Sequence, residues 1–219
     1  MSPILARSLP FGLYILFLAI EGSLPKWAPD FDVRWLYPVK ATVVALALAV
    51  LWRQYTELKS WHLSAAHFLL SLLVGVVVLI LWVNLDASWM IVGDMGKGFR
   101  PIDANGDLDP VLIAFRIMGA ALVVPIMEEL FWRSFIQRWI HRPDFMSLDP
   151  AQIGVRALFI ASALFAVEHQ QWLAGLIAGL AYGGLYMYTK KLWAPILAHA
   201  VTNGGLGIYV LMTERWQFW

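Results

Sequence analysis

Residues 123–133 read Val-Val-Pro-Ile-Met-Glu-Glu-Leu-Phe-Trp-Arg, so two adjacent carboxylates and an arginine lie inside an otherwise apolar run. Ionisable side chains at membrane depth are costly, and they are usually paired and functional. Glu129 and Arg133 are four residues apart and can pair along one helix face. Glu128 points about 100° away around the helix and lacks that partner. We therefore expect one structural acid and one acid available for chemistry, unless the helix simply leaves the membrane at Glu128.

The composition places this run in an integral membrane protein. Of the 219 residues, 60% are hydrophobic and 14% are charged, whereas a soluble domain has roughly 45–50% apolar and about 25% charged residues. A net charge of +1 gives no case for a nucleic-acid partner. The chain has no cysteine, which excludes disulfides, a cysteine nucleophile and a thiolate metal site.

Seven apolar segments are expected to form helices: 9–24, 37–51, 65–83, 111–140, 153–169, 172–189 and 192–212. The predicted fold class is all-α, a polytopic membrane helix bundle of about seven transmembrane helices, or eight if a half-span is present. One domain is expected over residues 1–219. Its first part, 1–109, holds the N-terminal helices and an acidic outer loop, and 110–212 holds the polar motifs. The distribution of lysine and arginine over the loops predicts a cytoplasmic N-terminus.

Pro125 lies one turn before the two carboxylates. It removes a backbone donor and can bend the helix at that point. Freed carbonyls beside two acids are what a polar cavity inside a membrane bundle needs.

Two later segments carry further polar residues. Segment 153–169 ends in Phe165-Ala166-Val167-Glu168-His169, and segment 192–212 holds His199 and Asn203 on one helix face. With Glu128, these residues supply a general base, its partner and two hydrogen-bond donors. Taken singly, a membrane histidine is more often a helix–helix hydrogen-bond partner, and Glu168 could mark a helix end near water. The joint pattern, at similar depths of the bilayer, favours a site.

Two other stretches suggest how the bundle is packed. Gly175 and Gly179 form a GxxxG motif that Gly183 and Gly184 extend, so a neighbouring helix can approach this face closely. Residues 214–219, Glu-Arg-Trp-Gln-Phe-Trp, predict an aromatic tail at the membrane interface.

The polar residues fall into three ordered motifs that resemble those of the CAAX protease and bacteriocin-processing enzyme family of glutamic-type intramembrane proteases. The resemblance covers about residues 111–211. The motifs are Glu128-Glu129-x-x-x-Arg133, Phe165-x-x-x-His169 and His199-x-x-x-Asn203.

This resemblance implies roles for each residue. Glu128 would activate water together with His169, while His199 and Asn203 would hold the water and the oxyanion. The supporting residues would be Glu129 and Arg133, as a pair, and Phe165, packed beside the site. Members of the family have also been discussed as metalloproteases, but no metal or other cofactor is expected here, because there is no HExxH and the donor set lacks a closed ligand shell.

The resemblance also implies a substrate class. The expected substrate is a membrane-anchored protein or peptide, prenylated or carrying a sorting tag, that is cut near its C-terminus in the lipid bilayer. The bacterial inner membrane is the expected location, as in bacterial CAAX prenyl protease-related members. The sequence leaves the oligomeric state open.

Two other functions are compatible with the same residues. A buried Glu, His and Asn cluster would equally serve a proton or ion relay, although no paired broken helices of the transporter kind are apparent. A scaffold or immunity partner that has lost the chemistry is the other alternative, and the intact motif set argues against it.

Overall fold

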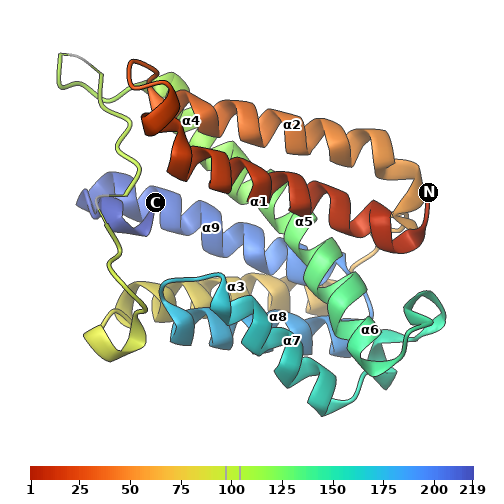
Figure 1. Ribbon diagram of the computed structural model, residues 1–219. Helices are drawn as coiled ribbons and strands as arrows, with labels where there is room; N and C mark the ends of the chain where they lie inside the picture. Colours follow the sequence, from red (N-terminus) through yellow and green to blue (C-terminus); the bar gives the residue numbers. More distant parts are fainter. Residues whose placement is uncertain (97, 104) are drawn as a thin grey trace.

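The structure is a computed structural model that describes residues 1–96, 98–103 and 105–219, and these parts form a bundle of helices (Figure 1). The helices are α1 (Pro3–Trp27), α2 (Leu36–Leu51), α3 (Ala65–Asn84), α4 (Pro110–Met118), α5 (Val124–Glu129), α6 (Arg138–His141), α7 (Val155–Val167), α8 (Trp172–Thr189) and α9 (Trp193–Thr213). Two π-helical stretches, Gly119–Val123 and Leu130–Gln137, join α4, α5 and α6 into one continuous helical segment.

Within the described residues, five helical segments are long and apolar enough to cross a membrane. They are Pro3–Leu24, Val33–Gln54, Ala65–Asn84, Pro110–His141 and Trp193–Thr213. Helix α7 is apolar but shorter, at 13 residues, and so rises only about 20 Å. The predicted all-α, polytopic membrane fold is confirmed.

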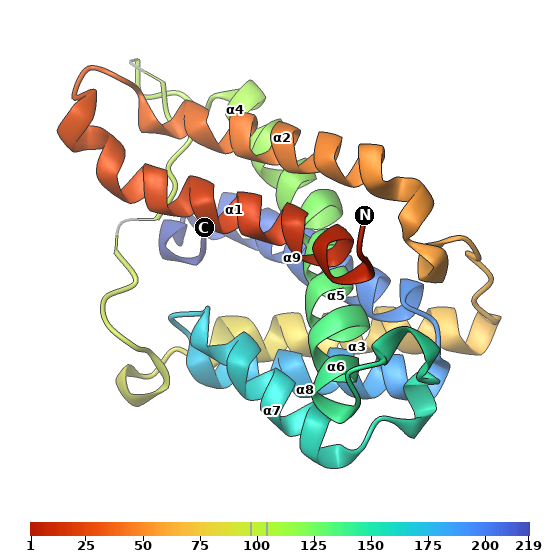
Figure 2. The same cartoon turned by 45° about the vertical axis from the view of Figure 1, so that its right-hand side comes forward.

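The segment Pro110–His141 crosses the bundle. In Figures 1 and 2, α1 and α2 lie side by side on one side, α3, α7 and α8 lie on the other, and α4–α6 run between them beside α9. Asp109 caps the start of this segment by accepting hydrogen bonds from the backbone N–H groups of Val111 and Leu112. The two carboxylates of α5 therefore lie in the interior, where all layers meet.

Close helix contacts occur at glycines. A Cβ atom on Gly75 of α3 would collide with the carbonyl of Ala198 in α9, and one on Gly179 of α8 would lie 2.9 Å from Cα of Ser162 in α7. The close approach predicted at the GxxxG motif is therefore present. The extension to Gly184 was wrong, because a Cβ there would meet nothing within 4 Å.

The end of α7 and the packing of the C-terminal tail add detail that the sequence did not predict. Helix α7 ends at Val167, so His169 follows the helix instead of lying within it. The aromatic tail packs against the bundle: Trp216 and Phe218 are buried, and the carbonyl of Trp219 accepts a hydrogen bond of 3.1 Å from the N–H of Phe99. The tail closes one end of the bundle because its apolar rings pack inward.

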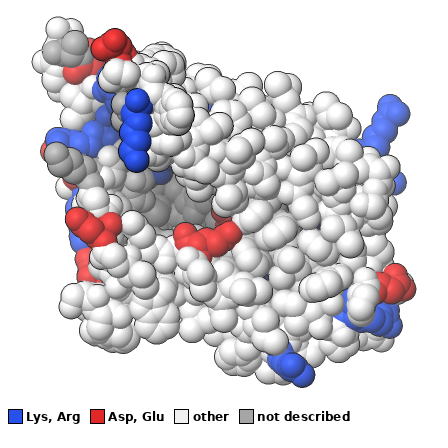
Figure 3. All heavy atoms as spheres, viewed as in Figure 1, with Lys and Arg blue, Asp and Glu red and all other residues white. Residues whose placement is uncertain are grey.

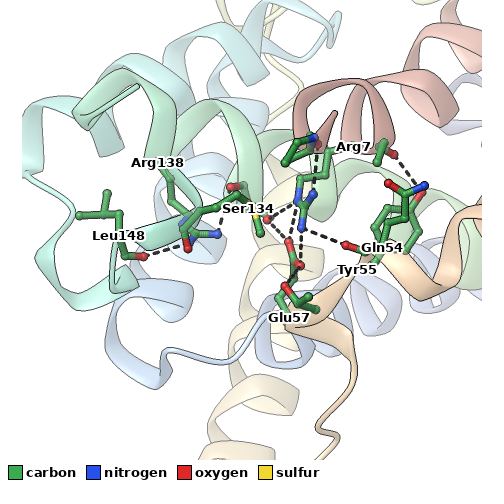
Figure 4. A network of polar contacts seen from close by, with 11 residues as sticks. Arg7, Gln54, Tyr55, Glu57, Ser134, Arg138 and Leu148 are labelled. Carbon is green, nitrogen blue, oxygen red and sulfur yellow. Dashed lines mark hydrogen bonds and ion pairs between the residues drawn. The ribbon is translucent and has the colours of Figure 1, made fainter. Parts of the chain in front are cut away.

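A buried ion pair fastens the start of α1 to the rest of the bundle (Figure 4). The Arg7 guanidinium lies 2.6 Å from Oε2 of Glu57, in the loop between α2 and α3, and also donates to Oγ of Ser134. Ser134 in turn donates to Glu57. Burial acts to raise the pKa of Glu57, but the hydrogen bonds and charge of Arg7 and the bond from Ser134 hold it below its ordinary value.

Candidate active site

The four residues predicted to carry chemistry line one cavity of about 240 Å³. They come from three separate parts of the chain: the end of α5, the loop after α7 and the middle of α9. The four residues are Glu128, His169, His199 and Asn203. Phe165, predicted to pack beside the site, also lines this cavity.

Glu128 is the acid without a partner. Its side chain is buried, and within the described residues its Oε2 atom has no hydrogen-bond partner. The nearest basic atom is Nε2 of His199, 4.0 Å away, which is beyond hydrogen-bond reach. A buried carboxyl that spends no hydrogen bonds on the fold is free to meet a reactant in the cavity.

Glu129 makes the pair with Arg133 that the i, i+4 spacing predicted. Its Oε2 accepts a hydrogen bond of 3.1 Å from Nε of Arg133, and neither side chain is exposed. Its Oε1 lies 3.0 Å from Nδ1 of His199, a contact between α5 and α9 that spacing along one helix cannot reveal. The Arg133 guanidinium lies over the Phe165 ring, 4.9 Å from its centroid. Glu129 thus orients one histidine of the site while it neutralises Arg133.

The end of α7 orients His169. Its Nδ1 lies 2.9 Å from the carbonyl oxygen of Phe165, which lies in the last turn of α7 and also accepts from the N–H of Glu168. A carbonyl can only accept, so Nδ1 carries the proton, and Nε2 of the neutral ring is an acceptor. The ring also meets Trp82 edge to face, with centroids 5.2 Å apart. His169 therefore enters the cavity in one defined tautomer.

The position of Asn203 depends on the irregular start of α5. Its Nδ2 donates to the carbonyl oxygen of Ala120 at 2.9 Å. In this π-helical stretch the N–H of Val124 donates to the carbonyl of Gly119, five residues earlier. In the same register, the Ala120 carbonyl would accept from the N–H of residue 125. Pro125 has no N–H, and the Ala120 carbonyl is left for Asn203. The freed carbonyl predicted from Pro125 is present, and the second Nδ2 hydrogen of Asn203 remains available.

Sequence reasoning missed the residues that pack behind His199. The Tyr182 ring stacks on the His199 ring, with centroids 5.0 Å apart and an interplanar angle of 20°. The Tyr182 hydroxyl donates to Oγ1 of Thr202 at 2.7 Å, and Thr202 lies 2.9 Å from the Gly75 carbonyl. The only available signals were a tyrosine in a glycine-rich segment and a threonine beside Asn203.

A second cavity, of about 310 Å³, gives Glu128 a side opening between α1 and the end of α7. Apolar residues of α1 line it together with Glu128, His169 and Glu168. Glu168 is exposed and accepts a hydrogen bond of 3.0 Å from Nε1 of Trp132. Figure 3 shows a hollow near the middle of this face, with acidic side chains along its lower edge. In the described parts of the chain, no group of three or more His, Asp or Glu side chains is arranged to hold a metal ion.

Comparison with known proteins relates the same half of the chain to peptidases. Residues 110–205 match the family model described as "Type II CAAX prenyl endopeptidase Rce1-like". A protein of Bacillus subtilis (strain 168), "Putative membrane peptidase YdiL", is 28% identical over 112 residues, which cover 49% of this chain and 43% of that relative. No solved structure matches the chain. These two matches and the three ordered motifs support an assignment of residues 110–205 to the CAAX protease and bacteriocin-processing family.

Proposed function

We propose that this protein is an intramembrane endopeptidase of the glutamic type, which hydrolyses a peptide bond near the C-terminus of a membrane-tethered protein or peptide. The observation that carries the proposal is the convergence of Glu128, His169, His199 and Asn203 on one cavity with a side opening. The match of residues 110–205 to the Rce1-like model supports the same reaction class.

In this proposal, Glu128 and His169 activate the attacking water. The cavity of about 240 Å³ has room for several waters, each of which takes about 30 Å³ in the liquid. The unpaired Glu128 carboxylate and the acceptor Nε2 of His169 can each accept a proton from such a water. The resulting hydroxide attacks the carbonyl carbon of the peptide bond, and the proton then passes to the leaving amine as the C–N bond breaks.

In this proposal, Asn203 and His199 donate hydrogen bonds to the oxyanion of the tetrahedral intermediate. Asn203 offers its remaining Nδ2 hydrogen, and His199 offers Nε2–H when both of its nitrogens are protonated. Both donors are held in advance, Asn203 by the Ala120 carbonyl and His199 by Glu129. Preorganised donors of this kind need no rearrangement during the reaction.

The side opening suits a substrate that arrives within the bilayer. Leu18, Ile15 and Phe11 of α1 form its apolar wall, so a membrane-tethered segment can reach Glu128 without crossing bulk water. This supports a substrate with a lipid or transmembrane anchor, and we propose a prenylated or sorting-tagged protein in a bacterial cell membrane, the class that the family resemblance implies.

The test is hydrolysis of lipidated peptides by the purified chain in proteoliposomes. Two sets of decapeptides are used, one N-palmitoylated and one carrying a farnesylated cysteine, in water enriched in ¹⁸O. We expect fragments whose new carboxylate contains solvent oxygen, and at least about a hundredfold loss of rate in Glu128→Gln, since one catalytic proton-transfer group contributes about 10²–10⁴.

Glu214→Gln is the matched control, because Glu214 is an exposed acid beyond α9. It should cleave at the wild-type rate. Cleavage by Glu128→Gln at that same rate would overturn the proposal. Absence of fragments, together with a proton flux that His169→Ala abolishes, would indicate the relay function instead.

A further inference from the structure

An acid without an ionic partner, Glu168, lies at the side opening of the candidate active site. It directly follows α7 and lines the cavity of about 310 Å³ together with Glu128 and His169. The rest of that lining comes from α1, and its residues are Phe11, Tyr14, Ile15 and Leu18. Within the described parts of the chain, no basic side chain forms an ion pair with Glu168. The opening therefore carries a negative charge that the described fold does not neutralise.

Trp132 fixes the position of this carboxylate. Its Nε1 donates a hydrogen bond of 3.0 Å to Oε2 of Glu168. The indole is buried and meets the rings of Phe11 and Phe165 edge to face, with centroids 5.9 Å and 6.0 Å away. Its N–H therefore points in one direction. An indole has a single donor, so the other oxygen of Glu168 can accept hydrogen bonds from a ligand.

The place of Glu168 in the fold is unfavourable for an acid. Glu168 is the C-cap residue of α7, and the helix macrodipole favours cations, not anions, at a helix C-terminus. An ionised side chain at the edge of an apolar membrane bundle is also costly unless it is paired. A cation bound beside Glu168 would interact favourably with both the carboxylate and the helix end. A ligand with a positive charge therefore accounts for an acid at this position.

Glu128 adds a second unpaired acid to the same cavity. Its side chain is 9% exposed, and its Oε2 atom has no hydrogen-bond partner among the described residues. The side opening thus presents one buried and one exposed carboxylate, next to a histidine ring whose tautomer makes it neutral. A cation that enters the opening meets acceptors and no competing positive charge.

The other neighbour of the site has the opposite charge. A basic pocket of about 570 Å³ shares Tyr14, Arg116 and Trp219 with the cavity of Glu128. The charged residues of its lining are Glu21, Arg34, Lys40, Arg100 and Arg116. This excess of positive charge repels a cation, whereas the side opening attracts one. A substrate with a basic side chain is therefore oriented with that side chain in the side opening.

Helix geometry sets where the basic side chain lies along the substrate. Trp132, which holds Glu168, is four residues beyond Glu128 on the same helix face. At about 1.5 Å per residue this is about 6 Å along the helix. An extended peptide covers about 3.3–3.6 Å per residue. A side chain that reaches Glu168 therefore belongs to a residue about one to three positions from the peptide bond at Glu128.

We propose that Glu168 is a specificity-determining residue that binds a lysine or arginine side chain of the substrate, about one to three residues from the cleaved bond. This inference rests on the proposed peptidase function. It gives the substrate a chemical class, a membrane-anchored peptide whose apolar segment carries a basic residue beside the cleavage site.

The test measures binding apart from cleavage, in the full-length Glu128→Gln protein, where Glu168 is the remaining carboxylate of the opening. The medium is dodecyl maltoside at about pH 8, far above the ordinary glutamate pKa of about 4.3. The probes are N-palmitoylated, fluorescein-labelled apolar decapeptides with one lysine, placed at each position in turn, or with uncharged N-acetyl-lysine in its place. At about one or two adjacent positions we expect lysine to bind about tenfold tighter by fluorescence anisotropy, as one charged hydrogen-bonded pair predicts.

Substitutions of Glu168 in this protein assign the preference. Glu168→Gln should reduce it to about twofold or less, and Glu168→Lys should reverse it, so that a glutamate peptide binds tighter than its glutamine counterpart. Both changes are at an exposed position, which keeps the fold intact. Glu214→Gln, an exposed acid outside the opening, should leave the preference unchanged. Equal binding of lysine and acetyl-lysine peptides, a preference of the same size at every position, or one that survives Glu168→Gln would overturn the proposal.

Two further measurements separate the occupant and the reaction. If phosphatidylethanolamine in mixed micelles abolishes the lysine preference, and phosphatidylcholine, whose amine has no N–H to donate, does not, the opening holds a lipid amine and the peptide assignment is wrong. If the preference depends on Glu168 but the protein with Glu128 intact cleaves no peptide, the cation site stands and the peptidase function fails. Glu128-dependent cleavage of lysine and acetyl-lysine peptides with equal kcat/KM would leave the peptidase function standing and overturn the role of Glu168.

Discussion

Nδ1 of His199 lies 3.0 Å from Oε1 of Glu129, although the two residues are 70 positions apart in the chain. This contact directs Nε2 of His199 toward Glu128, at 4.0 Å. The second acid of the pair therefore supports two groups at once, because its other oxygen accepts from Arg133. The two adjacent glutamates have different environments, one fully hydrogen-bonded and one open to the cavity.

Loss of the Glu129 carboxylate should destabilise the fold strongly. In Glu129→Ala the completely buried Arg133 would keep its charge without a carboxylate, and breaking a buried pair in this way costs about 3–5 kcal/mol. Thermal unfolding in detergent should show a clear fall in Tm. Glu129→Ala combined with Arg133→Met should be less destabilised than the sum of the single changes, because the uncompensated charge is gone.

The control for this prediction is Asp149→Ala. Asp149 pairs with Lys190, and about half of each side chain is exposed, so the Tm should change little. A Glu129→Ala protein as stable as wild type would show that the buried pair does not hold this helix.

Pro125→Ala should separate activity from stability. It supplies an N–H that can donate to the Ala120 carbonyl and so competes with Asn203 for this acceptor. Alanine is the best helix former, so the Tm should stay the same or rise. Peptide cleavage should fall at least about tenfold, since removing one oxyanion donor costs about 10²–10³ in kcat.

The coupling of Pro125 to Asn203 can be checked directly. In an Asn203→Ala background, Pro125→Ala should have no further effect on cleavage, because the side chain it displaces is already gone. Pro110→Ala is the control, since proline at a helix start replaces an N–H that has no helical acceptor. Additive losses in the double variant would contradict the proposed route.

Glu57 should make stability depend on acid pH. Its pKa is lowered in the folded protein, so the folded state binds fewer protons than the unfolded state in this range. The stabilisation is complete above the ordinary glutamate value of about 4.3 and is lost as the pH falls through the lower folded pKa. Glu57→Gln should cost about 1–3 kcal/mol at pH 7.

The measurement is thermal unfolding of wild type and Glu57→Gln between pH 7 and pH 3. The difference in Tm between them should shrink as the pH falls, while contributions from other carboxyls cancel in the comparison. Glu214→Gln, which changes an exposed acid, should follow the wild type throughout. A Tm difference that stays constant with pH would show that Glu57 does not titrate as a paired acid.

Two glycines of α8 should respond to alanine with opposite signs. In Gly179→Ala the new methyl group would lie 2.9 Å from Cα and Cβ of Ser162, so α7 and α8 must separate, at a cost of about 1–3 kcal/mol. Gly184→Ala meets nothing within 4 Å and should gain up to about 1 kcal/mol from helix propensity. Equal effects on thermal unfolding would argue against this close contact.

Much of the fold follows from local patterns. The predicted segment 172–189 coincides with α8 (Trp172–Thr189), and segment 65–83 with all but the last residue of α3 (Ala65–Asn84). Apolar run length and flanking polar residues are properties of short stretches, so single-segment reasoning captures them. It failed at the end of α7, where the last turn tightens and His169 bonds back to the Phe165 carbonyl.

The sequence by itself determined which helices form, that Glu129 pairs with Arg133, and that Pro125 frees a carbonyl, because each depends on spacing within one helix. Only the tertiary structure decided that Glu129 also holds His199, that Asn203 takes the Ala120 carbonyl, and that Arg116 lies between the site and a basic pocket. These contacts join different elements, and helix crossing and packing set their distances. That Glu128 lacks a partner within its own helix is thus predictable from the eleven residues 123–133. The residues that surround Glu128 are set by the packing of the whole bundle.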